Sequence, residues 1–187
     1  MYRHSRHNRI LSLDVRSKTL AYAVFDGCAY LLDFSVSSSI LDGFQASRIE
    51  RLVRKFQPDV IVLRRVPVGS TRDTPVVRAA IKSIRSKARH LSVPVVVIGR
   101  PLIEKTFRRH CKPTKYRIAV LLAGCFPSLT WYLPRQRKIY TPEDRRMQYF
   151  DAAAVGLAYF AATGDAEALQ QFLSKAESFR RPLASGA

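Results

Sequence analysis

Cysteine is scarce in this 187-residue chain, which has only Cys28, Cys111 and Cys125. The three lie far apart and form no Cys-x-x-Cys pair, which argues against a disulfide framework and against a zinc site built from paired cysteines. His110 adjoins Cys111, but two neighbouring residues seldom converge on one metal without further ligands. We therefore expect ordinary reduced thiols, as in a cytoplasmic protein.

Long apolar runs are also absent. No segment reaches the roughly 18 uninterrupted apolar residues that a membrane-spanning helix requires. The opening segment MYRHSRHNRI is positively charged, but it leads into a short strand-like run containing Asp14 and not into the apolar core of a secretion signal. The sequence thus predicts no membrane partner and no secretion.

Acidic residues are few, since 14 Asp and Glu stand against 32 Lys and Arg, and the formal net charge is +18. Arg supplies 23 of the cations, and its planar guanidinium grips phosphate oxygens in pairs. The cations are spread along the chain, so the folded body itself is expected to be electropositive. The predicted partner is a polyanion, namely nucleic acid, with DNA favoured.

Hydrophobic and turn patterns predict five strands. The first segment is apolar apart from Ser12 and Asp14, and Asp26-Gly27 is a strong hairpin signal between the second and third segments. Two later apolar runs, the second of them around Pro94, are typical of buried strands. The expected strands span residues 10–15, 20–25, 29–36, 59–63 and 93–98.

Apolar residues at spacings of three and four predict the helices. The first follows a possible cap at 37–39, and the second, after Pro75, has a basic outer face. Thr141-Pro142-Glu143-Asp144 has the order expected at a helix start, with a hydroxyl cap, a proline and then acids. Residues 126–140 are expected to be irregular, and the helices are expected at 44–56, 75–91, 102–109, 115–125, 141–162 and 165–179.

This order of elements predicts an α/β fold with a mixed sheet, in which a three-strand antiparallel meander is joined by parallel strands and flanked by helices. It is the order of the ribonuclease-H-like fold. We expect one domain over residues 1–187, with flexible ends at 1–8 and 180–187.

Two carboxylates occupy positions that packing alone does not explain. Asp14 lies inside an apolar strand, where an ionised side chain is costly unless a cation, a metal or hydrogen bonds compensate it. Asp151 interrupts the apolar stripe of the last long helix. Small residues at 152–154 would let this helix approach the sheet and bring Asp151 near Asp14. The alternatives are that Asp14 caps a turn and that Asp151 is solvated.

The segments ILSLDVRSKTLAYAVF (10–25) and YFDAAAVGLAYF (149–160) resemble the first and last motifs of the RuvC and YqgF group of ribonuclease-H-like proteins. The resemblance implies that Asp14 and Asp151 are catalytic and bind Mg²⁺ or Mn²⁺ for phosphodiester cleavage, as in Holliday junction resolvases. It also implies that Lys112 and Lys115 contact the phosphate backbone.

The sequence departs from the family pattern at three places. Arg16 replaces the usual Gly two residues after the first Asp, and Gln148 replaces an acid one turn before the last Asp. Arg64 and Arg65 stand where a Glu usually ends the fourth strand. A cation there would repel Mg²⁺ if it pointed into the site, or would pair with the carboxylates and remove the need for metal.

Asp144 is a candidate third metal ligand, because it precedes Asp151 by two turns on a similar face of the expected helix. Glu143 is a similar candidate. Their position at the expected helix start explains both acids more simply, as caps of that helix.

Basic residues near these motifs and on the helix after Pro75 are the candidate nucleic-acid contacts. They would follow a duplex or a junction with salt-sensitive affinity, although any single one could be a solvated surface cation. They are Arg16, Lys18, Arg64, Arg65, Arg78, Lys82, Arg85, Arg108, Arg109, Lys112, Lys115 and Arg117.

Three functions fit the sequence. The favoured one is a RuvC-like, divalent-metal-dependent endonuclease acting on branched or structured DNA. The alternative is a non-catalytic nucleic-acid-binding relative in which Arg64 or Arg65 occupies the former metal site. A third is a basic assembly protein that uses the scaffold for protein or ribosomal contacts. A homodimer is compatible with either of the first two.

Overall fold

The computed structural model describes residues 9–38, 44–137, 140–164 and 166–178. Their centre is a five-stranded sheet with the strand order β3-β2-β1-β4-β5. The first three strands form an antiparallel meander, and β4 and β5 run parallel to β1, so the predicted mixed sheet is confirmed. The strands are β1 (Arg9–Val15), β2 (Leu20–Asp26), β3 (Tyr30–Ser37), β4 (Val60–Arg64) and β5 (Val95–Ile98).

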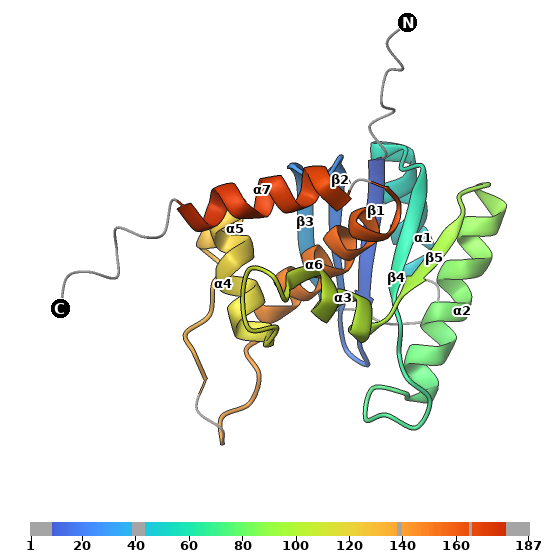
Figure 1. Cartoon of the computed structure of the whole chain (residues 1–187). Coiled ribbons are helices and arrows are strands. Elements are labelled where there is room, and N and C mark those ends of the chain that lie inside the picture. The colour runs from blue at the N-terminus through green and yellow to red at the C-terminus, as the bar shows by residue number, and fades with distance from the viewer. Residues whose placement is uncertain (1–8, 39–43, 138–139, 165, 179–187) are drawn as a thin grey trace, which may run out of the picture.

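Helices cover both faces of the sheet (Figure 1). On one face lie α1 (Phe44–Phe56) and α2 (Pro75–His90). On the other face α6 (Met147–Ala162) crosses β1 and β2 and carries further helices on its outer side. These are α3 (Arg100–Phe107), α4 (Lys115–Cys125) with the short α5 (Pro127–Thr130), and α7 (Ala166–Ser178). Within the described part of the chain, no helix is long and apolar enough to cross a membrane.

β1 separates the two halves of the core. Leu11 and Leu13 pack toward α1 and α2, whereas Ile10 and Ser12 face α6. Because successive side chains of a strand point to opposite faces, Asp14 is placed on the α6 side, one residue before β1 ends. The strand alternation thus directs this carboxylate toward the last long helix.

The predicted start of the last long helix at Thr141 is wrong, since α6 begins at Met147. Residues 141–146 form an irregular segment that ends in a turn at 145–146, and the Asp144 carboxylate accepts a hydrogen bond from the Arg146 backbone N–H at 2.8 Å. The side chain of Glu143 binds Arg16 and Lys115 instead of capping a helix. Its ion pairs explain why the segment stays outside the helix.

The prediction that β5 is buried is also wrong. Among the described residues β5 is an edge strand that pairs with β4 alone, and Val96 and Val97 are 36% and 38% exposed. Two further expectations, a cap reaching residue 39 and flexible ends at 1–8 and 180–187, fall on positions outside the described residues.

α6 approaches the sheet closely because small residues face it, as predicted for 152–154. The Ser12 hydroxyl lies 2.9 Å from the Ala152 carbonyl oxygen and 3.0 Å from that of Ala23, and so joins β1 to α6. A Cβ atom added at Gly156 would lie 2.7 Å from the Phe25 ring and 3.1 Å from the Ser12 hydroxyl oxygen. Phe25 cannot retreat easily, since it is fully buried against Phe126.

Gly156→Ala is therefore expected to lower the free energy of unfolding by about 1–3 kcal/mol, because the added methyl overpacks the contact between α6 and the sheet. Thermal and denaturant unfolding measure the change. The matched control is Gly124→Ala at an exposed position of α4, where the better helix propensity of alanine should leave the melting temperature unchanged or raise it. Equal melting temperatures for wild type and Gly156→Ala would contradict this packing account.

Candidate functional site

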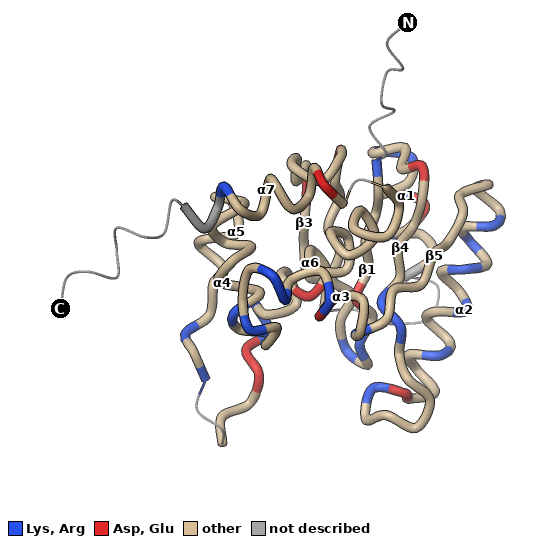
Figure 2. The backbone as a smooth tube through the Cα atoms, in the orientation of Figure 1, with Lys and Arg blue, Asp and Glu red and all other residues tan. Residues whose placement is uncertain are grey.

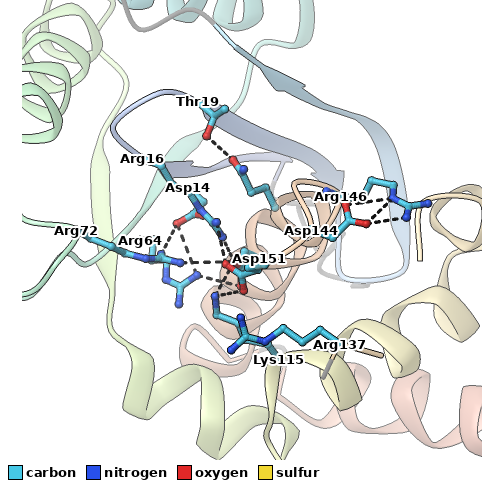
Figure 3. Close-up of polar contacts among 12 residues, drawn as sticks. Asp14, Arg16, Thr19, Arg64, Arg72, Lys115, Arg137, Asp144, Arg146 and Asp151 are labelled. Atoms are coloured by element: carbon cyan, nitrogen blue, oxygen red, sulfur yellow. Dashed lines mark hydrogen bonds and ion pairs between the residues drawn. The ribbon is translucent and has the colours of Figure 1, made fainter. Parts of the chain in front are cut away.

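Asp14 and Asp151 meet at the end of β1 on the α6 side of the sheet (Figure 3). Both are buried, with 1% and 8% of the residue exposed. Asp151 lies in the second turn of α6, just before the close contact between Ala152 and Ser12. The close approach of helix and sheet therefore brings the two carboxylates to one place, as the sequence predicts.

Three arginines lie between and around these two carboxylates. The Nη1 atom of Arg64 is 3.1 Å from Asp151 Oδ1 and 3.6 Å from Asp14 Oδ1. Arg72, from the loop between β4 and α2, lies 3.3 Å from Asp14 and 3.8 Å from Asp151. Arg16 donates from Nε to Asp14 at 3.0 Å and from Nη2 to Asp151. Every one of the three guanidinium groups thus contacts both carboxylates.

Glu143 and Lys115 extend this arrangement toward solvent. Glu143 accepts from Arg16 Nη1 at 3.0 Å and also binds Lys115, whose ammonium nitrogen lies 3.7 Å from Asp151. We call the whole set the carboxylate–arginine cluster. Its members are Asp14, Arg16, Arg64, Arg72, Lys115, Glu143 and Asp151.

A tight turn after β1 holds Arg16 in position. The backbone N–H of Arg16 donates to the Thr19 carbonyl at 2.9 Å, closing the turn between β1 and β2. The Thr19 hydroxyl in turn donates to the side-chain carbonyl of Gln148 at 2.5 Å, and both side chains are buried. Gln148 therefore anchors the turn to α6 at a position where the resemblance would place another acid.

The charges of the cluster are compensated without any further ion. Its three carboxylates face four cations, which leaves one net positive charge. Burial raises the pKa of the Asp151 carboxyl, but the surrounding cations, with Arg64 first, outweigh burial and hold this pKa below its ordinary value. Burial likewise raises the pKa of Glu143, and Lys115 and Arg16 outweigh it to lower that pKa.

The residues present do not fit a divalent metal ion. Carboxylate oxygens that would bind the metal are already bound to guanidinium groups, and the net positive charge of the cluster disfavours a further cation. Across the described ranges, no group of three or more His, Cys, Asp and Glu side chains is arranged to hold a metal. The arrangement instead resembles a buried ion-pair network.

Three solved structures of similar shape are named for RuvC or for Holliday junction resolvases. Thermus thermophilus RuvC in complex with a Holliday junction substrate aligns with a TM-score of 0.63 at 16% identity, over 84% of this chain and 97% of RuvC. The yeast mitochondrial Holliday junction resolvase Ydc2 gives 0.58 at 14% identity, over 92% and 83% of the two chains. The fowlpox virus Holliday junction resolvase gives 0.50 at 17% identity, over 82% and 99%.

The chain has a RuvC-type ribonuclease-H-like fold. Neither a protein-family model nor a curated protein sequence matches it. The likeness in shape confirms the fold expected from the two motifs. Because the sequence identity is low, the comparison supports a conclusion about the fold alone.

On this RuvC-type fold, the candidate metal ligand Asp144 lies away from Asp14 and Asp151. Its carboxylate forms an ion pair of 2.7 Å with Arg146, and Figure 3 shows the pair apart from the carboxylate–arginine cluster. The hydrogen bonds from Arg146 lower the pKa of Asp144 more than burial raises it. Asp144 organises the turn before α6 and does not join the cluster.

The predicted nucleic-acid contacts divide into two groups. Arg16, Arg64 and Lys115 belong to the carboxylate–arginine cluster, and only 13–18% of the two arginine side chains is exposed. The remaining candidates are exposed on the surface, which leaves them accessible to a polyanion: Lys18, Arg65, Arg78, Lys82, Arg85, Arg108, Arg109, Lys112 and Arg117.

One member of the cluster, Arg72, is not predicted from the sequence. It comes from a loop that carries no periodic signal, and only the folded chain shows that this loop reaches the end of β1. Glu143 is a candidate site residue in the sequence, although the simpler expectation for it, a cap of the last long helix, is wrong. The polar pair Thr19 and Gln148 also went unrecognised, although an uncharged residue at a family acid position was a signal that the site differs.

Neutralising either buried carboxylate should destabilise the protein. Asp14→Asn and Asp151→Asn are each expected to lower the free energy of unfolding by about 3 kcal/mol, because each leaves guanidinium groups without their counter-charge. Denaturant unfolding measures the change, and Asp144→Asn, which breaks an exposed pair worth less than about 1 kcal/mol, is the control. If the two carboxylates were metal ligands that repel each other in the metal-free protein, the same substitutions would remove this repulsion and raise the free energy of unfolding. A higher free energy of unfolding in either variant would therefore contradict the account.

The stability of the cluster should also depend on pH. The pKa values of Asp151 and Glu143 are lowered on folding, so their contribution is fully present above the unfolded values of about 4 and is lost as pH falls through the lowered folded values. The melting temperatures of wild type and Asp151→Asn should differ by a constant amount above about pH 4 and should converge as pH falls below it, through the lowered folded values. A difference that stays constant as acid unfolding is approached would refute the assignment.

Proposed function

We propose that this protein is a non-cleaving, RuvC-fold protein that binds branched or structured DNA. In this proposal the carboxylate–arginine cluster takes the place of a metal-dependent nuclease centre. The homodimer that the sequence allows remains untested, and the single domain over 1–187 remains a prediction.

The observation that carries the proposal is the position of Arg64. It ends β4, where the resemblance places a metal-binding Glu, and its guanidinium lies between Asp14 and Asp151. A cation at this position both occupies the carboxylate oxygens and repels Mg²⁺. Cleavage through two bound metals would need these oxygens to be free.

Two observations support DNA as the partner. The chain carries a net charge of +18, with arginine in the majority, and many of its cations lie exposed. The similar structures are Holliday junction resolvases, one of them solved with its junction substrate. A shared fold and a basic surface together support binding of branched DNA similar to the junction bound by RuvC. Binding of this kind does not require that the DNA be cleaved.

The second candidate function is the metal-dependent endonuclease. One observation favours it, namely that Asp14, Glu143 and Asp151 all contact the single side chain of Arg16. If DNA binding drew the cationic side chains onto phosphates, Asp14 and Asp151 would be left facing each other and could bind Mg²⁺ or Mn²⁺. The two functions differ in whether divalent metal produces cleavage.

A combined binding and cleavage assay separates them. Wild-type protein is tested on a four-way junction, a duplex, single-stranded DNA and RNA, each with Mg²⁺, Mn²⁺ or a chelator. We expect binding to the junction without cleavage in any condition, and affinity that falls steeply as salt rises because phosphate contacts release counterions. Cleavage that requires Mg²⁺ or Mn²⁺ and disappears in Asp14→Asn would overturn the proposal in favour of the endonuclease.

A further inference from the structure

The outer face of α2 carries a stripe of cations. Arg78, Lys82, Arg85 and Arg89 follow one another at spacings of four, three and four residues, which places them on one face of the helix, and all four are exposed. Figure 2 shows positive residues repeated along this helix. At 1.5 Å per residue the stripe is about 16 Å long.

Most of this stripe has no neutralising partner. Arg78 forms an ion pair of 2.9 Å with Asp73, but Lys82, Arg85 and Arg89 have no ion pair with any residue that the structure describes. The neighbouring helix α1 differs, because its Arg54 binds Glu50 at 2.7 Å and its Lys55 lies 3.5 Å from Asp33. The positive charge of α2 is thus available to an external ligand.

Two hollows run beside the stripe and join it to the carboxylate–arginine cluster. One has a volume of about 530 Å³ and lies along α2 from Arg78 to Arg89. The other, of about 470 Å³, is lined by Arg64 and Arg65 from the end of β4. Val66, Ile81 and Arg85 line both hollows, so the two lie next to each other.

Arg64 continues the path beyond these hollows. It also lines a small pocket together with Arg100, Lys115 and Asp151. A row of basic side chains therefore extends from the cluster, across the end of β4 and the edge strand β5, to the far end of α2. We call the part formed by the two larger hollows and the stripe the α2 track.

We propose that the α2 track binds the phosphate backbone of a duplex DNA arm that extends from the carboxylate–arginine cluster. This inference rests on the proposed DNA-binding function and names the surface that holds one arm. Arg65, Lys82, Arg85 and Arg89 contact phosphate oxygens, and the apolar side chains of Val66 and Ile81 form the floor between them.

The composition of the track favours a duplex over an unpaired strand. Proteins that hold single strands stack the bases on aromatic side chains, and neither of the two larger hollows has an aromatic residue in its lining. Contacts to a duplex backbone need only cations and polar groups. The length of the stripe matches about five base pairs at 3.4 Å per step along one strand.

The test compares two triple variants that remove the same charge from neighbouring helices. Lys82→Gln/Arg85→Gln/Arg89→Gln removes three cations of the track, and Arg51→Gln/Arg54→Gln/Lys55→Gln removes three exposed cations of α1. Binding of a blunt duplex, a four-way junction and a single strand is measured by fluorescence anisotropy over a range of salt concentrations. Because all six side chains are exposed, both variants should melt near the wild-type temperature.

We expect the α2 variant to bind the duplex and the junction about tenfold or more weakly, with a salt slope smaller by about 2.7, since each phosphate contact contributes about 0.9. The α1 variant should keep the wild-type slope. Equal losses of affinity in the two variants, or no loss in either, would refute the proposal that the α2 track binds DNA. Neither result would refute the proposed DNA-binding function of the protein. A loss confined to the single strand would overturn the duplex assignment. Failure of the wild-type protein to bind any of the DNAs would instead refute the proposed function itself.

Discussion

The contact of Arg64 with both Asp14 and Asp151 is the interaction on which the rest of this site depends. Asp14 of β1 and Asp151 of α6 are buried close together, so their negative charges repel each other. These charges must be compensated by a metal ion or by cationic side chains. Here the compensation is built into the chain, with Arg16 and Arg72 completing what Arg64 begins. The same side chains stabilise the fold and occupy carboxylate oxygens that a metal ion would otherwise bind.

This arrangement requires α6 to lie very close to the sheet. The hydrogen-bonded contact of Ser12 with Ala152 and the absence of a side chain at Gly156 set that distance. A helix held farther away would leave Asp151 beyond the reach of guanidinium groups that also touch Asp14. Close packing in the core and charge compensation at the strand end are therefore two consequences of the same small residues.

The sequence predicted the sheet, most helices and the meeting of the two carboxylates, because these follow from periodicity and from two polar residues in apolar segments. It could not predict which cation would fill the site, since that depends on loop geometry, and Arg72 carries no local signal at all. The misplaced start of α6 has the same origin. A helix-start pattern at Thr141 was outweighed by tertiary ion pairs of Glu143 that no local rule contains.

A RuvC-type fold with a cationic centre would bind DNA without cleaving it, and the α2 track would be one of the DNA-binding surfaces.

The most direct test of this account is a crystal structure of the protein grown with Mn²⁺ and recorded at a wavelength where manganese scatters anomalously. The account predicts the Arg64 guanidinium between Asp14 and Asp151 and no anomalous peak there. A manganese peak coordinated by both carboxylates, with Arg64 displaced, would contradict it.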